Sequence, residues 1–211
     1  LVVSDPYFSI WSPYDQLTDG SPRHWTNDEK PLEGLLRVDG KTYRFMGVKN
    51  TVLETIVPMA DEVAWTGAMT HEKPAGGWER PDFDDSKWKR AEGAFGSRGL
   101  SNVRTRWDKE NSDLYVRRAV ELTPEDLAGE LFLVFSHDDV FEIYINGALV
   151  AKTGETWREG VKQELTEELK QLLHPGKNVI AAHCHNTTGG AYSDFGLYRN
   201  VGAENGNPEL A

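Results

Sequence analysis

The sequence contains a single cysteine and no long apolar run. Cys184 alone cannot form an internal disulfide within the 211 residues, and it leaves the redox compartment undecided. No stretch approaches the roughly 20 apolar residues of a membrane-spanning helix, so we predict no membrane span. Basic residues are outnumbered, with 23 Lys and Arg against 34 Asp and Glu and a net charge of −11. This balance argues against a nucleic-acid partner, because a phosphate backbone attracts positive charge.

Motifs for self-contained catalysis are also missing. The nucleophile elbow G-x-S-x-G is absent, since Gly96–Gly99 is one residue short, and there is no H-E-x-x-H, phosphate loop or dinucleotide fingerprint. Glycoside hydrolysis needs two carboxyl groups that face each other across the bond. The acids considered for that role carry no mark of such a pair: Asp138, Asp139, Glu142 and Asp194. We therefore predict no catalysis by this chain on its own, and an independent glycoside hydrolase is the less favoured alternative.

Residues Glu130–Asn200 are predicted to form the second half of a β-sandwich. The bulky apolar residues of Leu131–Phe135 and Val140–Ile145 are typical of buried strands, and Val179–His185 indicates another strand. Asn146-Gly147 directly follows the second run and predicts a hairpin, because both residues tolerate the positive φ angles of a type I′ turn.

Local signals predict further turns. Thr166, followed by acids, is expected to cap one or two helical turns, and Pro124 is expected to open a single turn. Asp39-Gly40 predicts a hairpin in the N-terminal part, and Trp65 is expected in the core. Gly93–Asp113 is polar and is interpreted as a long loop, which in a compact domain is usually functional or mobile.

An ordered series of motifs between about Trp65 and Val201 resembles the sugar-binding domains at the front of family-2 glycoside hydrolases. The matching segments are Phe83–Trp88 (F-D-D-S-K-W), Leu114–Arg118 (L-Y-V-R-R), Phe135–Val150, Pro175–Asn178 (P-G-K-N), Asn186 and Gly196–Arg199 (G-L-Y-R). The resemblance implies a galactose-binding-like jelly roll. It also implies that the catalytic glutamates lie in a separate barrel, which this chain lacks.

The N-terminal stretch Val3–Gly47 resembles the start of secreted bacterial glutaminase-A-type proteins. That resemblance implies a secreted or periplasmic chain at the front of a larger hydrolase. The sequence therefore predicts an all-β fold, an antiparallel jelly-roll β-sandwich with a short N-terminal strand-rich extension. The expected divisions are residues 1–60 for the extension, 61–202 for the jelly roll and 203–211 for a flexible tail.

A carbohydrate site combines an aromatic face with side chains that bond hydroxyl groups. The residues expected to supply these groups from loops are Arg98, Trp107, Trp157, Asn186, Tyr192 and Asp194. Asp194 stands two residues before Gly196, where the family resemblance implies an approach to the sugar of an adjoining catalytic domain. The alternative is that Asp194 caps a turn, the tryptophans fill the core and the domain is a scaffold, either of a glycoside hydrolase or of a glutaminase-like amidohydrolase.

Metal binding is weighed against simpler roles. His183 and His185 share one face of a strand, opposite Cys184, and could bind a metal if His137 came near. Hydrogen-bonded structural histidines are the favoured interpretation. The acidic loops Asp82–Asp85 and His137–Asp139 make a structural calcium possible, but neither shows a complete ligand pattern. Capping of a turn by Asp84 is favoured, and we predict no cofactor.

Overall fold

The structure is a computed structural model that describes residues 2–5, 8–12, 17, 21–26, 28–30, 32–46 and 51–201. The chain divides into two compact units, and each is described by itself. The larger unit is Leu53–Asn200, and the smaller unit is Leu1–Val52 together with Val201–Ala211. No helix in the described part of the chain has the length and apolar character needed to cross a bilayer.

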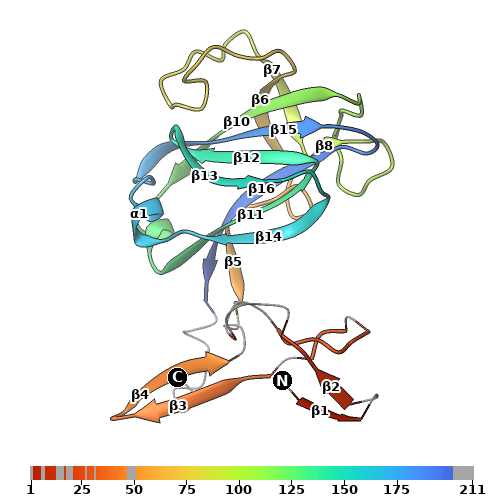
Figure 1. The fold of residues 1–211 in the computed structure, drawn as a ribbon. Helices are drawn as coiled ribbons and strands as arrows, with labels where there is room; N and C mark the ends of the chain where they lie inside the picture. Colours follow the sequence, from red (N-terminus) through yellow and green to blue (C-terminus); the bar gives the residue numbers. More distant parts are fainter. Residues whose placement is uncertain are drawn as a thin grey trace. The chain divides into compact units, whose positions relative to one another are not determined.

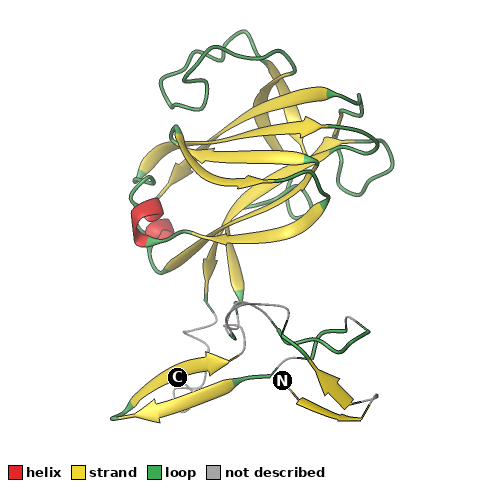
Figure 2. Ribbon diagram, viewed as in Figure 1, coloured by secondary structure: helices red, strands yellow, loops and turns green. Residues whose placement is uncertain are grey.

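The larger unit is a sandwich of two six-stranded sheets (Figures 1 and 2). In spatial order, the first sheet consists of β13 (Ala148–Thr153), β12 (Val140–Ile145), β15 (Gly176–Asn186), β10 (Ser112–Leu122), β6 (Trp65–Thr70) and β7 (Lys89–Gly93). The second consists of β14 (Arg158–Glu164), β11 (Glu130–Asp138), β16 (Tyr192–Asn200), β8 (Phe95–Gly96) and β9 (Thr105–Arg106), with β5 (Leu53–Val57) also paired to β16. All pairs are antiparallel except β8 with β9. The predicted all-β jelly-roll class is confirmed.

Alternating side chains from both sheets fill the space between them. Phe141, Ile143 and Ile145 of β12 are fully buried, as are Phe195 and Leu197 of β16. Each such side chain contributes about 1.5–3 kcal/mol through its removal from water. Trp65 also packs in this core, as predicted. The sandwich is therefore held by apolar contacts between layers that are far apart in sequence.

The predicted turns form where the sequence places them. Asn146 and Gly147 have φ angles of 48° and 96° and join β12 to β13. The helix α1 (Glu167–Lys170) begins after Thr166, whose hydroxyl accepts a hydrogen bond from the Leu169 amide. A single 3-10 turn, η1 (Glu125–Leu127), follows Pro124.

Two segments differ from the sequence-based expectation. Gly93–Asp113, expected to be one loop, contains β8 and β9 because Phe95 is fully buried and pairs with Ser193 of β16. The compact unit also begins at Leu53, earlier than the expected boundary between residues 60 and 61. The reason is that β5 pairs with β16 and so belongs to the second sheet.

The outer face of the first sheet is covered by the connection between β6 and β7. Trp78 from this connection packs on Tyr115 of β10 and Tyr144 of β12, at ring-centroid distances of 5.2 and 5.6 Å. Trp88 stacks against Trp78 at 6.1 Å, so it joins this outer cluster and not the core between the sheets. The cluster keeps the connection on the sheet.

Arg117 of β10 anchors the same connection. Its side chain is buried and forms an ion pair with Asp85 at 2.9 Å. It also donates hydrogen bonds to three backbone carbonyl oxygens, those of Trp78, Arg80 and Phe83. One guanidinium therefore satisfies acceptors spread over six residues of an otherwise irregular segment.

The smaller unit contains two two-stranded sheets in its described part, formed by β1 (Val2–Asp5) with β2 (Phe8–Ile10) and by β3 (Gly34–Val38) with β4 (Lys41–Met46). Asp39 and Gly40 have φ angles of 49° and 79°, so the predicted hairpin between β3 and β4 is confirmed. Exposed apolar side chains of this unit are Trp11, Trp25, Leu35, Leu36, Val38, Phe45 and Val52. The expected tail at 203–211 lies outside the described residues.

Candidate functional site

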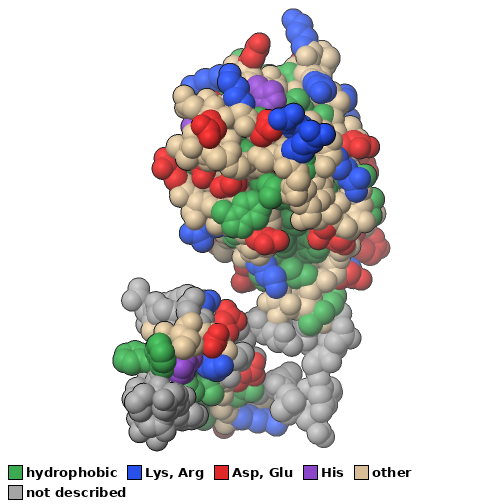
Figure 3. Space-filling model, turned by 90° about the vertical axis from the view of Figure 1, so that its right-hand side faces the viewer, with side chains coloured by type: hydrophobic (Ala, Val, Ile, Leu, Met, Phe, Trp, Pro, Cys, Tyr) green, Lys and Arg blue, Asp and Glu red, His purple; other side chains and the backbone are tan. Residues whose placement is uncertain are grey.

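A groove of about 620 Å³ lies on the larger unit, over the second sheet. Strands β5, β11, β14 and β16 and the loops beside them supply its lining residues: Leu53, Thr55, Met59, Asp61, Glu62, Leu100, Ser101, Asn102, Val134, Ser136, Trp157, Glu159, Gly160, Tyr192, Asp194 and Tyr198. Figure 3 shows hydrophobic side chains gathered on one face of this unit, with charged side chains around them. The lining of the groove combines apolar and aromatic side chains with polar and acidic ones.

One wall of the groove is the segment that follows β5. The Met59 amide donates to the Tyr198 hydroxyl at 3.2 Å, and the Ala60 amide donates to Asp194 Oδ2 at 2.8 Å. Arg118 donates to the Pro58 carbonyl at 2.8 Å. These bonds come from β10 and β16, so both sheets hold the wall in place. Burial lowers the pKa of Arg118 to about 10, which leaves the guanidinium charged at neutral pH.

Trp157 and Tyr192 form the aromatic part of the groove. Trp157 lies in the loop between β13 and β14 and is 44% exposed. Its ring meets that of Tyr192 at a centroid distance of 5.5 Å and an interplanar angle of 65°. Tyr192 is only 8% exposed, yet within the described part of the chain its hydroxyl has no hydrogen-bond partner. A ligand in the groove would meet one open aromatic face and one unpaired hydroxyl.

Asp194 lines the groove, but hydrogen bonds within the protein already use most of its acceptor capacity. Its carboxylate accepts hydrogen bonds from the Ala60 amide at 2.8 Å, Trp65 Nε1 at 2.9 Å and the Phe195 amide at 3.0 Å. Burial raises the pKa of Asp194 to about 6 despite these bonds. A carboxylate has about four acceptor sites, so little capacity remains for a ligand. Asp194 mainly positions the wall and the Trp65 indole.

The other three predicted residues lie apart from these. Trp107 is buried and donates from Nε1 to the Ser112 hydroxyl at 2.9 Å. Asn186 is fully buried, with Nδ2 bonded to the Lys109 carbonyl at 3.1 Å. Arg98 is exposed in the loop that contributes Leu100–Asn102, but it does not line the groove. The structure thus brings together Trp157, Tyr192 and Asp194 only.

The sequence did not single out several lining residues. Asp61 and Glu62 come from the wall after β5, and Glu159 comes from β14. They are far apart in the sequence and carry no motif. The pairing of β5 with β16, which brings the first two to the groove, has no local signal that could have revealed it.

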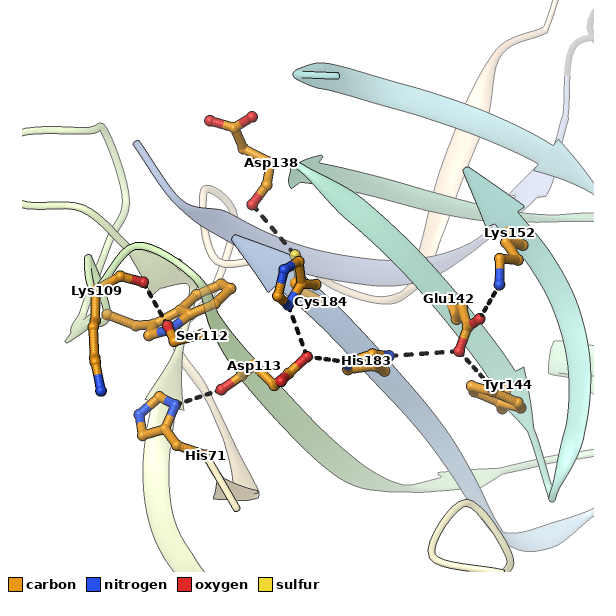
Figure 4. A network of polar contacts seen from close by, with 12 residues as sticks. His71, Lys109, Ser112, Asp113, Asp138, Glu142, Tyr144, Lys152, His183 and Cys184 are labelled. Atoms are coloured by element: carbon orange, nitrogen blue, oxygen red, sulfur yellow. Dashed lines mark hydrogen bonds and ion pairs between the residues drawn. The ribbon is translucent and has the colours of Figure 1, made fainter. Parts of the chain in front are cut away.

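His183 and His185 lie on the same face of β15, as predicted, and both bond to one aspartate, Asp113. Figure 4 shows the contact between Asp113 and His183. His183 Nε2 is 2.7 Å and His185 Nδ1 is 3.0 Å from Asp113 Oδ1. His183 Nδ1 is 3.5 Å from Glu142, which also pairs with Lys152 at 2.6 Å. Although burial alone would raise it, the hydrogen bonds from both histidines hold the pKa of Asp113 below its usual value.

His137, the third metal ligand considered, has partners of its own. Its Nδ1 is 2.7 Å from the Asp139 carbonyl oxygen and its Nε2 is 2.9 Å from the Thr153 hydroxyl. Among the residues that the structure describes, no three His, Cys, Asp or Glu side chains are arranged to hold a metal ion. The three histidines therefore belong to structural hydrogen-bond networks.

The two acidic loops are also occupied by internal contacts. Asp84 accepts a hydrogen bond from the Ser86 amide at 3.0 Å, which is the capping role favoured from the sequence. Asp139 accepts from the amides of Thr187 and Thr188 at 2.8 and 3.4 Å. Burial and the neighbouring Asp139 raise the pKa of Asp138 to about 6.

The fold and the groove define a β-sandwich module with an open aromatic site. A family described as a domain of unknown function (DUF4964) matches residues 1–58. No curated protein matches the chain. The glutaminase-type resemblance of the N-terminal stretch stays a prediction.

Solved structures of larger enzymes are similar to this chain at low identity. A calcium-binding mutant of Bacteroides uniformis β-glucuronidase 2 is 14% identical, with a TM-score of 0.49, over 71% of this chain and 18% of that one. A glycosyl hydrolase family 2 member from Bacteroides cellulosilyticus is 15% identical, with a TM-score of 0.45, over 63% and 20%. The β-D-mannosidase of Dictyoglomus thermophilum is 17% identical, with a TM-score of 0.41, over 63% and 16%. This chain therefore spans a fifth or less of each of these proteins.

Proposed function

We propose that the larger unit is a non-catalytic accessory module that binds carbohydrate in the groove over the second sheet. The observation that carries the proposal is the 44% exposed Trp157 beside Tyr192 at the edge of a groove bordered by carboxylates. An aromatic face packs against the C–H groups of a sugar ring, and the polar border can bond its hydroxyl groups.

Several features of the groove support carbohydrate binding. Trp157 is exposed, so it can stack on a ligand without first breaking a buried contact. The wall after β5 is already held by Asp194, Tyr198 and Arg118, so binding requires little ordering of the protein. We expect weak affinity, with a Kd of about 0.1–1 mM.

The proposal extends to the parent protein. The ordered motifs between Trp65 and Val201 support a place at the front of a larger hydrolase, with adjoining catalytic domains as the other partners. A secreted or periplasmic location follows from the resemblance of Val3–Gly47 to secreted proteins and is proposed on that basis. The alternative is a scaffold with no ligand of its own, for a glutaminase-like amidohydrolase or a glycoside hydrolase.

Isothermal titration of the full 211-residue chain with a panel of neutral, amino and acidic oligosaccharides tests the proposal. We expect heat of binding with at least one member and a loss of about tenfold or more in affinity for Trp157→Ala, about 1.4 kcal/mol. Trp25→Ala is the matched control, because Trp25 is an exposed tryptophan of the smaller unit. Absence of heat with the whole panel, or equal binding by Trp157→Ala, would refute sugar binding in this groove and leave the scaffold.

A further inference from the structure

The groove is bordered by charge of one sign. Four of its lining residues carry carboxyl groups: Asp61, Glu62, Glu159 and Asp194. Within the described part of the chain, its lining includes no lysine, arginine or histidine. A bound molecule would therefore meet negative charge from the wall after β5 and from β14, whereas the charge of Asp194 on β16 is partly offset by the buried Arg118 behind it.

Two of these carboxylates are available to a ligand. Glu62 is engaged by the Tyr198 hydroxyl and by the Thr55 hydroxyl at 2.5 Å, and Asp194 accepts three hydrogen bonds. Asp61 and Glu159 are exposed, and neither forms a hydrogen bond or ion pair with any residue that the structure describes. The groove thus presents two unpaired negative charges on opposite elements.

The Tyr192 hydroxyl is a second feature of the groove that a ligand could use. It belongs to a residue that is 8% exposed and lines the groove, and it has no hydrogen-bond partner in the described structure. A phenol accepts as well as donates hydrogen bonds, so it can take an N–H group while the carboxylates balance a positive charge. Burial, and after it Asp194, Asp61 and Glu159, raise the pKa of this hydroxyl and keep it neutral.

We propose that the groove selects saccharides that carry protonated amino groups, such as oligomers of glucosamine, over neutral sugars, and that it rejects uronic acids. The inference rests on the proposed carbohydrate-binding function and adds the chemical class of the ligand. An ammonium group offers three donors to the carboxylates and the Tyr192 hydroxyl, and it is attracted to the open face of Trp157. A uronate would bring like charge beside unpaired carboxylates.

A lysine-rich segment of a protein carries the same ammonium groups and is the main competing occupant. A sugar is favoured because the exposed Trp157 ring supplies a flat apolar face next to the charges, which suits a pyranose ring better than a flexible aliphatic chain. Tetralysine is therefore included among the probes.

The experiment titrates the full chain with four probes of equal length: a β-1,4-glucosamine tetrasaccharide, its N-acetylated counterpart, a galacturonic acid tetrasaccharide and tetralysine. Measurements are made at about 50 mM and about 500 mM salt, because screening weakens exposed charge interactions. We expect the glucosamine oligomer to bind about tenfold more tightly than the N-acetylated one at low salt. We expect this preference to shrink at high salt and the galacturonate not to bind.

Two matched double variants distinguish the effect of charge in the groove from the effect of the net charge of the protein. Asp61→Asn combined with Glu159→Gln removes two charges from the groove and keeps the side-chain shapes. Glu72→Gln combined with Glu92→Gln removes two exposed charges elsewhere on the larger unit. The preference for glucosamine should disappear in the first pair and persist in the second.

The outcomes distinguish failure of the charge selectivity from failure of carbohydrate binding itself. Equal binding of the amino and N-acetylated sugars, with Trp157→Ala still harmful, overturns the charge selectivity and leaves carbohydrate binding intact. Binding of galacturonate, or an unchanged preference in Asp61→Asn/Glu159→Gln, also overturns the selectivity. Tighter binding of tetralysine than of any saccharide assigns the groove to a basic protein segment. If no probe and no neutral sugar binds, both the selectivity and the proposed function fail.

Discussion

Replacement of Arg117 should detach the long connection between β6 and β7 from the first sheet. The guanidinium is 3% exposed and is the shared donor for Asp85 and for the carbonyls of Trp78, Arg80 and Phe83. In Arg117→Met the aliphatic volume is nearly kept, but the guanidinium hydrogen bonds to all four acceptors are lost. Asp85 keeps Arg90 and the Arg80 carbonyl keeps the Phe83 amide, whereas the carbonyls of Trp78 and Phe83 lose their side-chain donor.

The expected loss of stability follows from these contacts. A hydrogen bond that involves a charged group contributes about 1.5–3 kcal/mol, and removal of one partner from a buried ion pair costs about 3–5 kcal/mol. The bonds share one side chain, so their contributions do not add, and we expect about 4 kcal/mol for Arg117→Met. At roughly 2–4 °C per kcal/mol for a protein of this size, the Tm should fall by roughly 8–16 °C.

Urea denaturation followed by tryptophan fluorescence measures the change, and limited proteolysis reports on the connection itself. Arg117→Lys should be intermediate, because an ammonium cannot reproduce the planar fork of donors. Arg90→Gln is the control: Arg90 also pairs with Asp85, but its side chain is 58% exposed, so its loss should cost less than about 1 kcal/mol. A loss below about 1 kcal/mol for Arg117→Met, with no new cleavage between residues 71 and 88, would refute this account.

Two further predictions concern the sheet beneath the groove. The folded-state pKa of Asp194 is raised from 3.8 to about 6, so its contribution to stability is full below the lower value and is lost as the pH rises through the upper one. The stability of the wild type relative to Asp194→Asn, from urea denaturation at each pH, should fall by about 3 kcal/mol between about pH 3 and pH 7; a flat or rising difference would contradict it. For Gly196→Ala, a Cβ atom would lie 2.4 Å from the Val57 carbonyl oxygen, whereas one at Gly76 meets nothing within 4 Å. Thermal unfolding should show a loss of about 1–3 kcal/mol for Gly196→Ala and almost none for Gly76→Ala, and equal effects would refute the steric argument.

The features that local chemistry determines were predictable from the sequence. The Asn146-Gly147 and Asp39-Gly40 hairpins depend on residues that accept positive φ, and both turns form. The twofold alternation of a strand placed His183 and His185 on one face and Cys184 on the other, and the structure has this arrangement. These signals depend only on residues that are close together in the sequence.

Features that depend on distant segments were not predictable. Phe95 stands in a polar stretch, and its burial depends on Ser193, nearly a hundred residues away. Arg117 and Arg118 lie on opposite faces of β10, so alternation would expose one of them, yet both are buried because different segments cover the two faces. The same limit applies to the groove: Trp157 and Tyr192 were expected to bind ligand, but nothing in the sequence indicated that Asp61 would lie beside them.

The chain enters the larger unit at Leu53 in β5 and leaves it at Asn200 in β16, and these two strands are hydrogen-bonded to each other, with Leu53 opposite Asn200. The Val201 amide continues the ladder by donating to the Val52 carbonyl at 2.8 Å. A folded body whose two ends coincide can be placed within a host polypeptide while separating the host's flanking residues very little. In evolutionary terms the sandwich has the form of a cassette, which can be gained or lost at one point of another protein without rebuilding that protein.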